Sequence, residues 1–251
     1  MVDSLTLTVI TVCLNSEKTI EKCIKSVLSQ KSENVEFIVI DGGSSDKTIE
    51  IINRYADSID VVIIESDEGI YDAWNKGLRN VSGDFIAFLG SDDIYLPGAL
   101  KIYESYINDN PATEYVSSLV RYGQGKSSRV VGRAWNWDQF CRYMTVAHVG
   151  SFHSAQLFKS YGQFDTGFRI TGDYEFLLRC GPDLNAGFVP QITVEMGVGG
   201  VSSGNQQMVF DEALRAKRMH TNLSSLMLNW DKNIAKVKFY ARQKLLKAIP
   251  R

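Results

Sequence analysis

The chain has 251 residues, of which 44% are hydrophobic and 22% charged, and its formal net charge at pH 7 is −2. This balance indicates a globular protein of one large or two small domains, with enough apolar residues for a substantial core. It excludes a low-complexity protein, and no apolar run reaches the roughly 20 residues that a membrane-spanning helix needs.

The basic residues gather at the C-terminal end. From Arg215 to Arg251 ten Lys or Arg residues stand against one acid, Asp231, so the body is acidic and the tail strongly basic. This asymmetry predicts contact with a polyanionic surface, either a membrane or a nucleic acid.

The cysteines and the N-terminal segment indicate a cytosolic protein. Residues 1–15 lack the basic start and small-residue cleavage site of a signal peptide. The four cysteines form no CxxC pair and are scattered through apolar segments: Cys13, Cys23, Cys141 and Cys180. We therefore expect reduced core thiols rather than a disulfide framework or a zinc site.

The first hundred residues alternate predicted strands with predicted helices. Apolar, β-branched runs predict strands at 5–15, 35–40, 61–66 and 83–90. Apolar residues at helical spacing predict helices at 16–30, 47–56, 69–81 and 96–109. A repeated strand–helix unit implies right-handed crossovers and a largely parallel, twisted sheet, in which ligands bind outside the carboxyl ends of the strands.

The second half is less regular. Two runs, 113–123 and 127–135, predict an antiparallel pair around a glycine-containing turn. Residues 171–181 predict a short helix and residues 188–197 a last strand. The Gly/Ser-rich stretch 197–205 is typical of a loop that acts as a lid.

From Gln206 onward the pattern is helical, and residues 231–251 predict a basic amphipathic helix. Its apolar face comprises Ile234, Val237, Ala241, Leu245, Ala248 and Ile249, and its basic side Lys232, Lys236, Lys244, Lys247 and Arg251. Such a helix either binds anionic lipid headgroups or packs on the body with a solvated basic face.

Two adjacent carboxylates, Asp92 and Asp93, follow the predicted strand 83–90 in the stretch "FIAFLGSDDIY". Gly, Ser and Asp favour turns after strands, so an ordinary turn is one interpretation. The alternative follows from convergence, because "VCLN", "DGG" and "SDD" all end strands of one parallel sheet and should share one crevice. Adjacent carboxylates there repel each other, and a hard divalent cation that carries a diphosphate relieves the repulsion.

Several other catalytic and nucleotide-binding motifs are absent from the sequence. It contains no GxxxxGK[ST] phosphate loop, no GxGxxG after the first strand and no GxSxG elbow. These absences argue against a P-loop hydrolase, a dinucleotide-dependent dehydrogenase and an α/β-hydrolase, and leave a metal–diphosphate site as the remaining interpretation.

Four motifs of the first hundred residues resemble, in order and spacing, those of the family 2 glycosyltransferases. They are "TVITVCLNSEKTIEKCIKSVLSQ", "EFIVIDGGSSDKTIEII", "DEGIYDAWNKGL" and "GDFIAFLGSDD". The resemblance returns at "FHSAQLFKSYGQFDTGFRITGDYEFLLR" and is weak between residues 101 and 147 and in the tail. The most similar members are bacterial enzymes that build O-antigen and other surface polysaccharides.

The resemblance implies a GT-A fold, which is a Rossmann-like nucleotide-diphospho-sugar transferase fold. Its sheet is mixed but mainly parallel and is flanked by helices. We expect a catalytic domain at 1–205, divided into a nucleotide-binding half (1–100) and an acceptor-side half (101–205). A basic helical extension should follow at 206–251.

The resemblance also implies a role for individual residues. Asp41 accepts a hydrogen bond from the uracil ring, Asp92 contacts the ribose or the metal shell, and Asp93 ligates Mn²⁺ or Mg²⁺. Asp173 is the catalytic base that takes the proton of the acceptor hydroxyl. The remaining residues implied to line the nucleotide-sugar pocket are Thr11, Asn15 and Asn75.

The sequence departs from the family pattern at several positions. Val12 stands where the family often has Pro, and Trp74 where it often has an Arg that contacts the nucleotide. Lys76 either supplies the missing charge or is an exposed helix lysine. Glu175 is the alternative base to Asp173, and His153 has either a packing or an acceptor-side role.

The resemblance implies an inverting, metal-dependent hexosyltransferase that uses a UDP-sugar. The acceptor is then a saccharide on a lipid diphosphate, and the enzyme is cytoplasmic and peripheral on the inner face of the bacterial cell membrane. Nucleic acid is not expected as a partner, because the body is acidic and no nucleic-acid motif is present. A sugar nucleotidyltransferase and an inactive nucleotide-sugar scaffold remain as alternatives.

Overall fold

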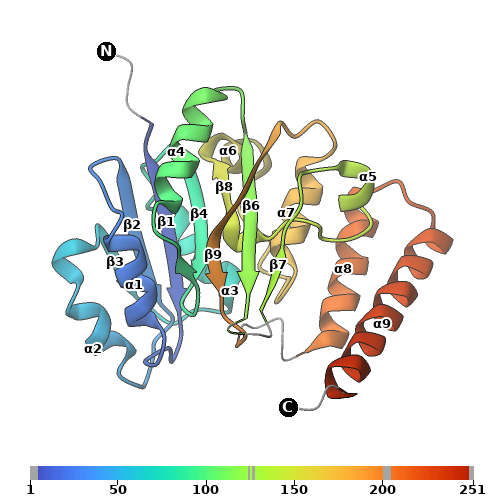
Figure 1. The fold of residues 1–251 in the computed structure, drawn as a ribbon, viewed down its shortest axis with the longest axis horizontal. Coiled ribbons are helices and arrows are strands. Elements are labelled where there is room, and N and C mark those ends of the chain that lie inside the picture. The colour runs from blue at the N-terminus through green and yellow to red at the C-terminus, as the bar shows by residue number, and fades with distance from the viewer. Residues whose placement is uncertain (1–4, 124, 126–127, 200–204, 249–251) are drawn as a thin grey trace.

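The computed structural model describes residues 5–123, 125, 128–199 and 205–248, with side chains described as far as residue 241. It confirms a mixed α/β fold in which one curled sheet is flanked by helices and a helical C-terminus stands beside it (Figure 1). The strands are β1 Leu7–Cys13, β2 Val35–Asp41, β3 Val61–Ile64, β4 Phe85–Gly90, β5 Ile94–Tyr95, β6 Tyr115–Tyr122, β7 Arg129–Val131, β8 Ser151–Ser154 and β9 Ala186–Met196.

The helices alternate with these strands in the first half and collect near the C-terminus. They are α1 Ile20–Leu28, α2 Thr48–Asn53, α3 Ile70–Leu78, α4 Ala99–Asp109, α5 Trp137–Phe140, α6 Ala155–Tyr161, α7 Gly172–Cys180, α8 Gln206–His220 and α9 Ser225–Ala248. Two short 3₁₀ turns, Ala56–Ser58 and His148–Gly150, complete the described elements.

The strands lie in the order β3-β2-β1-β4-β8-β6-β9-β5, with β7 paired to β6. β3, β2, β1 and β4 are parallel, as predicted, and β8 is antiparallel to both β4 and β6. The predicted antiparallel pair of the second half is confirmed as β6 and β7. Every residue of β1 is buried, which is typical of a central parallel strand covered on both faces.

Two apolar layers hold the helices to the sheet. Alternate residues of β1 face opposite sides: Val9 packs with α1, α2 and α4, whereas Ile10 packs with α3, α6 and α7. Helix α8 then packs on α7 through Ala216, which is fully buried, and α9 lies against α8 (Figure 1). The C-terminal helices are therefore attached to the side of the sheet that carries α7.

A buried ion pair attaches α9 to the body. Asp231 is fully buried, and its carboxylate accepts hydrogen bonds from Arg142 Nη2 at 2.5 Å and from Arg142 Nε at 3.1 Å. Lys217 Nζ of α8 lies 3.9 Å from the same carboxylate. The one acid of the basic tail is thus a packing residue of α9.

The structure differs from the predictions mainly at short elements. β5, β8, α5 and α6 were not predicted, because strands of two to four residues and helices of four to seven residues show little periodicity. Helix α9 begins at Ser225, before the predicted start, and its packed face includes Leu228 and Asp231, while Val237 of the predicted apolar face is exposed. The predicted lid at 197–205 lies mostly outside the described residues, as do the side chains of residues 242–251.

Other expectations concern the thiols and the membrane. All four cysteines are free and buried, as predicted. In the part of the chain that the structure describes, no helix is both long enough and apolar enough to span a bilayer.

Candidate active site

The carboxyl ends of three parallel strands meet at one edge of the sheet. Cys13, near the end of β1, is paired in register with Asp41 at the end of β2, and Val12 is paired with Gly90 at the end of β4. The loops that carry Asn15, Asp41 and the two adjacent aspartates therefore start from neighbouring positions, as the sequence predicts.

Asp92 and Asp93 differ in their environment. Asp92 is half-buried, whereas Asp93 is 5% exposed and accepts hydrogen bonds from the backbone N–H groups of Gly90 (3.1 Å) and Gly197 (2.9 Å). Burial, and after it the neighbouring charge of Asp92, raise the pKa of Asp93 to about 7. Gly197 lies so close to Asp92 that a Cβ at this position would collide with the Asp92 carboxylate.

These two aspartates fit a divalent cation. Burial and, after it, the charge of Asp92 make the ionised form of Asp93 unfavourable, as its raised pKa indicates, and a cation would relieve that cost. Among the residues whose positions are described, no group of three or more His, Cys, Asp or Glu residues could hold a metal ion by itself. The two aspartates offer carboxylate oxygens to such a cation, and diphosphate oxygens are suitable further ligands for Mg²⁺.

Asn15 and Asp41 organise the loop between β2 and α2. Asn15 adopts a left-handed conformation (φ 50°), and its Oδ1 accepts a hydrogen bond from Ser45 N at 2.9 Å. Asp41 is fully buried, and its carboxylate accepts from Gly43 N, Ser44 N and Ser44 Oγ at 3.0, 2.7 and 2.6 Å. Cys13 Sγ of β1 also lies 3.4 Å from Asp41 Oδ2, so the Asp41 carboxylate is held by its own loop and by the neighbouring strand, and its predicted contact with uracil stays a prediction.

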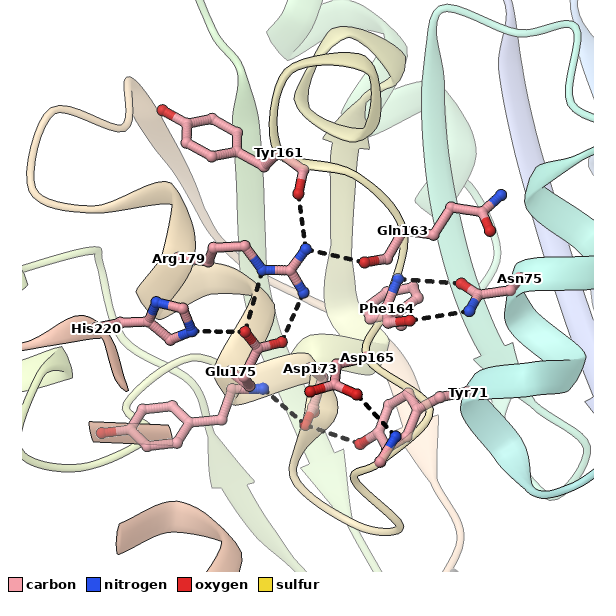
Figure 2. A network of polar contacts seen from close by, with 12 residues as sticks. Tyr71, Asn75, Tyr161, Gln163, Phe164, Asp165, Asp173, Glu175, Arg179 and His220 are labelled. Atoms are coloured by element: carbon pink, nitrogen blue, oxygen red, sulfur yellow. Dashed lines mark hydrogen bonds and ion pairs between the residues drawn. The ribbon is translucent and has the colours of Figure 1, made fainter. Parts of the chain in front are cut away.

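Two predicted donor-site residues have buried side chains. The hydroxyl of Thr11 faces Cys23 of α1 at 3.7 Å and is fully buried. Asn75 donates to Phe164 O at 2.9 Å and accepts from Phe164 N at 3.0 Å (Figure 2). The structure therefore joins Asn75 to the loop before α7, and the roles of both residues in donor binding stay predictions.

Three residues whose roles were open are packed in the interior. Trp74 is 6% exposed and stacks on His148, and His153 is fully buried with its Nδ1 at 3.3 Å from Ile86 O. Burial lowers the pKa of His153 well below its usual value and keeps the ring neutral. Lys76 is not an exposed helix lysine, because its Nζ donates to Ser66 O and pairs with Glu65.

Asp173 is the second residue of helix α7, and its side chain faces α3. Tyr71 Oη donates to its Oδ1 at 3.3 Å, and Tyr174 N donates to the same oxygen at 2.8 Å (Figure 2). The approach is close because Gly172 has no side chain, and a Cβ there would collide with the Tyr71 ring. Burial raises the pKa of Asp173 to about 6, which suits a group that must take up a proton near neutral pH.

Glu175 has a different environment from Asp173. It is 1% exposed, and its two oxygens accept from Arg179 Nε at 3.0 Å and Arg179 Nη2 at 2.6 Å. His220 of α8 lies 2.6 Å from Glu175 Oε1 (Figure 2). Both oxygens of Glu175 are thus held in ionic contacts, whereas the Asp173 carboxylate is the one that faces Tyr71.

Comparison with known proteins identifies the family. The family model of glycosyl transferase family 2 matches residues 8–167, which is more than half of the chain. The chain belongs to this family.

Two mycobacterial relatives agree with this membership. A PGL/p-HBAD biosynthesis glycosyltransferase of Mycobacterium bovis is 28% identical over 66% of this chain and 66% of its own length, slightly less than two thirds. An uncharacterized glycosyltransferase of Mycobacterium tuberculosis is 29% identical over 88% of this chain and 86% of its own length.

The solved structures support the fold alone, because their sequence identities are low. S. aureus TarS in complex with UDP-GlcNAc has a TM-score of 0.71 at 17% identity and covers 91% of this chain and 70% of that one. A Pyrobaculum calidifontis mannosyltransferase in complex with GDP-Man and Mn²⁺ has a TM-score of 0.66 at 15% identity, over 90% and 68%. This family 2 glycosyltransferase therefore has the GT-A fold that its motifs imply.

Some residues of the site were not predicted from the sequence. Tyr71 lies within the matched motif "DEGIYDAWNKGL", but its place in the site becomes visible only through its contact with Asp173 in the structure. Gly197 directly follows the last strand and was assigned to a loop, whereas in the structure its N–H donates to Asp93. Arg179 ends the matched segment at 152–179 and was given no role there, whereas His220 lies outside the matched segments. The folded chain brings both to Glu175.

We expect the Asp173 carboxyl to titrate with a midpoint near pH 6, because burial disfavours its charged form. Tyr71→Phe removes a hydrogen bond that favours the charged form, so the midpoint should rise further in that variant. Carboxyl ¹³C NMR measures both midpoints, and Asp173→Asn identifies the resonance. A wild-type midpoint at the ordinary aspartate value, or a fall in the Tyr71→Phe variant, would contradict this account.

Proposed function

We propose that this family 2 glycosyltransferase moves a hexosyl group from a UDP-sugar to a hydroxyl of a saccharide acceptor, with inversion at the anomeric carbon. The observation that carries the proposal is the placement of Asp173. It is a carboxylate of raised pKa that faces Tyr71, which follows the carboxyl end of β3. The paired aspartates after β4 stand at the same edge of the sheet.

The proposed chemistry requires one proton transfer and one displacement. Asp173 takes the proton of the acceptor hydroxyl, and the oxygen forms a bond to the anomeric carbon as the bond to the diphosphate breaks. Attack from the face opposite the leaving group inverts the anomeric centre. Tyr71 orients the Asp173 carboxylate, and burial keeps its pKa close to neutral pH, so that it is mostly free to accept the proton.

We propose that Asp93, with Asp92, holds Mn²⁺ or Mg²⁺. When bound, such an ion supplies positive charge against the departing diphosphate. Support comes from the residues themselves, since the pKa of Asp93 is raised partly by Asp92. The Pyrobaculum mannosyltransferase, which shares the fold, was solved with Mn²⁺.

The choice of UDP rests on weaker support than the choice of reaction. TarS was solved with UDP-GlcNAc, but the mannosyltransferase of the same fold was solved with GDP-Man. In this chain Asn15 and Asp41 shape the loop in which a base would lie, and Asp41 is the predicted acceptor for the uracil N–H.

The two alternatives have less support. A sugar nucleotidyltransferase would be expected to carry a glycine-rich basic loop near its N-terminus, where this chain has "VCLNSEKT". A scaffold without activity would not need a raised pKa at Asp173, which costs stability whenever the group is ionised.

We further propose a lipid-diphosphate-linked acceptor and a place on the inner face of a bacterial membrane, in surface polysaccharide synthesis such as that of O-antigen. The support lies in α9. Its outer face carries a stripe of exposed apolar side chains at helical spacing: Leu226 (85% exposed), Trp230 (64%), Val237 (68%) and Tyr240 (57%). Trp, Tyr and Leu beside lysines such as Lys238 are typical of a helix that lies in a membrane interface.

We expect Asp173→Asn to lower kcat by at least roughly 100-fold, the usual contribution of a general base, and to leave UDP binding unchanged. Steady-state transfer assays and calorimetric titration with UDP measure the two effects. Asp183→Asn is a matched control, since Asp183 is exposed just after α7. Normal turnover would refute the assignment as base, and lost UDP affinity would instead place Asp173 in the donor pocket.

The metal assignment predicts that wild-type protein binds UDP tightly only when Mn²⁺ is present. Asp93→Asn should abolish metal-dependent binding and turnover while circular dichroism stays unchanged, because the substitution is nearly isosteric. Normal activity in this variant would show that Asp93 does not hold the metal. If wild-type protein binds no UDP with or without metal, the donor base is wrong, and GDP and dTDP are the next to titrate.

The membrane assignment predicts binding to vesicles that contain anionic lipid and weaker binding as salt is raised. Trp230→Ser should weaken binding by at least roughly tenfold, since burial of a large apolar side chain is worth about 1.5–3 kcal/mol. Val130→Ser, an exposed apolar residue of β7, should have no effect. Co-sedimentation measures all three, and equal binding by Trp230→Ser and wild type would exclude this face.

A further inference from the structure

Three successive backbone N–H groups just before the catalytic helix point at one carboxylate. Arg169 N, Ile170 N and Thr171 N donate to Glu212 of α8 at 2.8, 2.9 and 2.9 Å. The Thr171 hydroxyl lies 3.4 Å from Glu212 Oε2. These amides belong to the N-cap residue and the two residues before it. The carboxylate satisfies them and, beside the N-terminus of α7, interacts favourably with the helix dipole.

In the first turn of α7 the Tyr174 N–H is satisfied by Asp173 itself, so the contact with Glu212 holds the segment that leads into the helix. Thr171 occupies the N-cap position, but its side chain makes no capping hydrogen bond. The N–H of Thr171 is bound instead by Glu212, a residue 41 positions further along the chain. Asp173 lies in the first turn of the helix, so Glu212 fixes the backbone from which the Asp173 side chain projects.

A second contact from α8 reaches the next turn of α7. His220 lies about two helical turns after Glu212 on α8, and its Nε2 is 2.6 Å from Glu175. Arg179 extends this network to the loop before α7, since its Nη1 donates to Tyr161 O at 2.7 Å and Gln163 O at 2.9 Å (Figure 2). The orientation of α7 is thus set from α8 at two points.

We propose that Glu212 is a positioning residue for the catalytic base: it holds the start of α7 so that Asp173 meets Tyr71 and the acceptor hydroxyl. This inference rests on the proposed function of Asp173. It also places α8 within the catalytic unit, whereas the sequence assigned residues 206–251 to a separate extension.

The electrostatic effect of Glu212 gives the proposal a readout that a purely structural role lacks. The groups around the Asp173 carboxylate are the hydroxyls of Tyr71 from α3 and Tyr115 from β6, the amide of Tyr174 in α7 and the negative charge of Glu212 from α8. Burial contributes most to the raised pKa of Asp173, and the charge of Glu212 raises it further. Loss of that charge should therefore lower the pKa, and the acid limb of the kcat–pH profile should move to lower pH.

The test compares Glu212→Gln with Asp211→Asn. Both remove one negative charge from α8, but the Asp211 side chain is exposed and pairs with Lys232 and Gln207. In Glu212→Gln, kcat should fall roughly 10- to 100-fold through misplacement of the base, with donor KM and UDP binding unchanged, and the acid limb should shift to lower pH. Asp211→Asn should change neither.

Two further measurements keep the test independent of any single variant. Amide hydrogen exchange at residues 169–171 should be faster in Glu212→Gln and unchanged in Asp211→Asn, whether or not a sugar is transferred. Glu212→Asp keeps the charge on a shorter side chain, so its kcat should be intermediate and its acid limb close to that of wild type.

The outcomes separate this inference from the proposed function. In an Asp173→Asn background Glu212→Gln should cause no further loss of rate, because the two residues act through one step. Unchanged exchange at residues 169–171, an unshifted acid limb, or multiplied losses in the double variant would overturn the role of Glu212 alone. Wild-type turnover in Asp173→Asn would overturn the base assignment and the role of Glu212 together.

Discussion

The fold depends on compensating the charge of the carboxylates that it buries. Asp41, Asp93, Glu175 and Asp231 are each 5% exposed or less, and an ionised carboxylate at such a position is costly unless donors or cations surround it. Asp41 is satisfied by the loop that follows it, and Asp231 by Arg142. Glu175 is satisfied by Arg179 and His220.

Asp93 and Asp173 are exceptions to this pattern. Each accepts two hydrogen bonds, yet their pKa values are raised to about 7 and about 6. Both lie at the edge where the parallel strands end. The ionised forms of Asp93 and Asp173 are therefore unfavourable at an edge where a bound substrate or ion could stabilise them. Perturbed pKa values of this kind are expected at functional sites.

Much of the fold could be predicted from the sequence because its signals are local. Continuous apolar runs identified the parallel strands β1 to β4, and the "GSDD" stretch located the paired aspartates at the edge. The matched segment around Asp173 identified a helix and its first turn. These features require only strand or helix periodicity and the rule that parallel strands end at one edge.

The remaining features depend on contacts between distant residues. Strand alternation places Thr11, like Val9 and Cys13, on the face covered by α1, and its contact with Cys23 depends on how α1 packs there. The side-chain amide of Asn75 has the chemistry of a ligand-binding group. Only the fold shows that its nitrogen donates to Phe164 O and that its oxygen accepts from Phe164 N. Glu212 could not be singled out among the charges of an amphipathic helix, because its partners lie more than 40 positions earlier in the chain.

The contacts of α8 also limit how such proteins can exchange segments by recombination. Glu212, Ala216 and His220 recur at four-residue intervals and so share one face of α8. This face meets α7 and the segment before it through carboxylate–amide hydrogen bonds, a packed methyl group and the short His220–Glu175 contact. A helix pair transplanted from another family member would fit only if it presented the same three chemical groups in the same register. A recombination breakpoint between β9 and α8 would thus separate α8 from the α7 residues that it contacts. A breakpoint after His220 would keep these contacts within one segment.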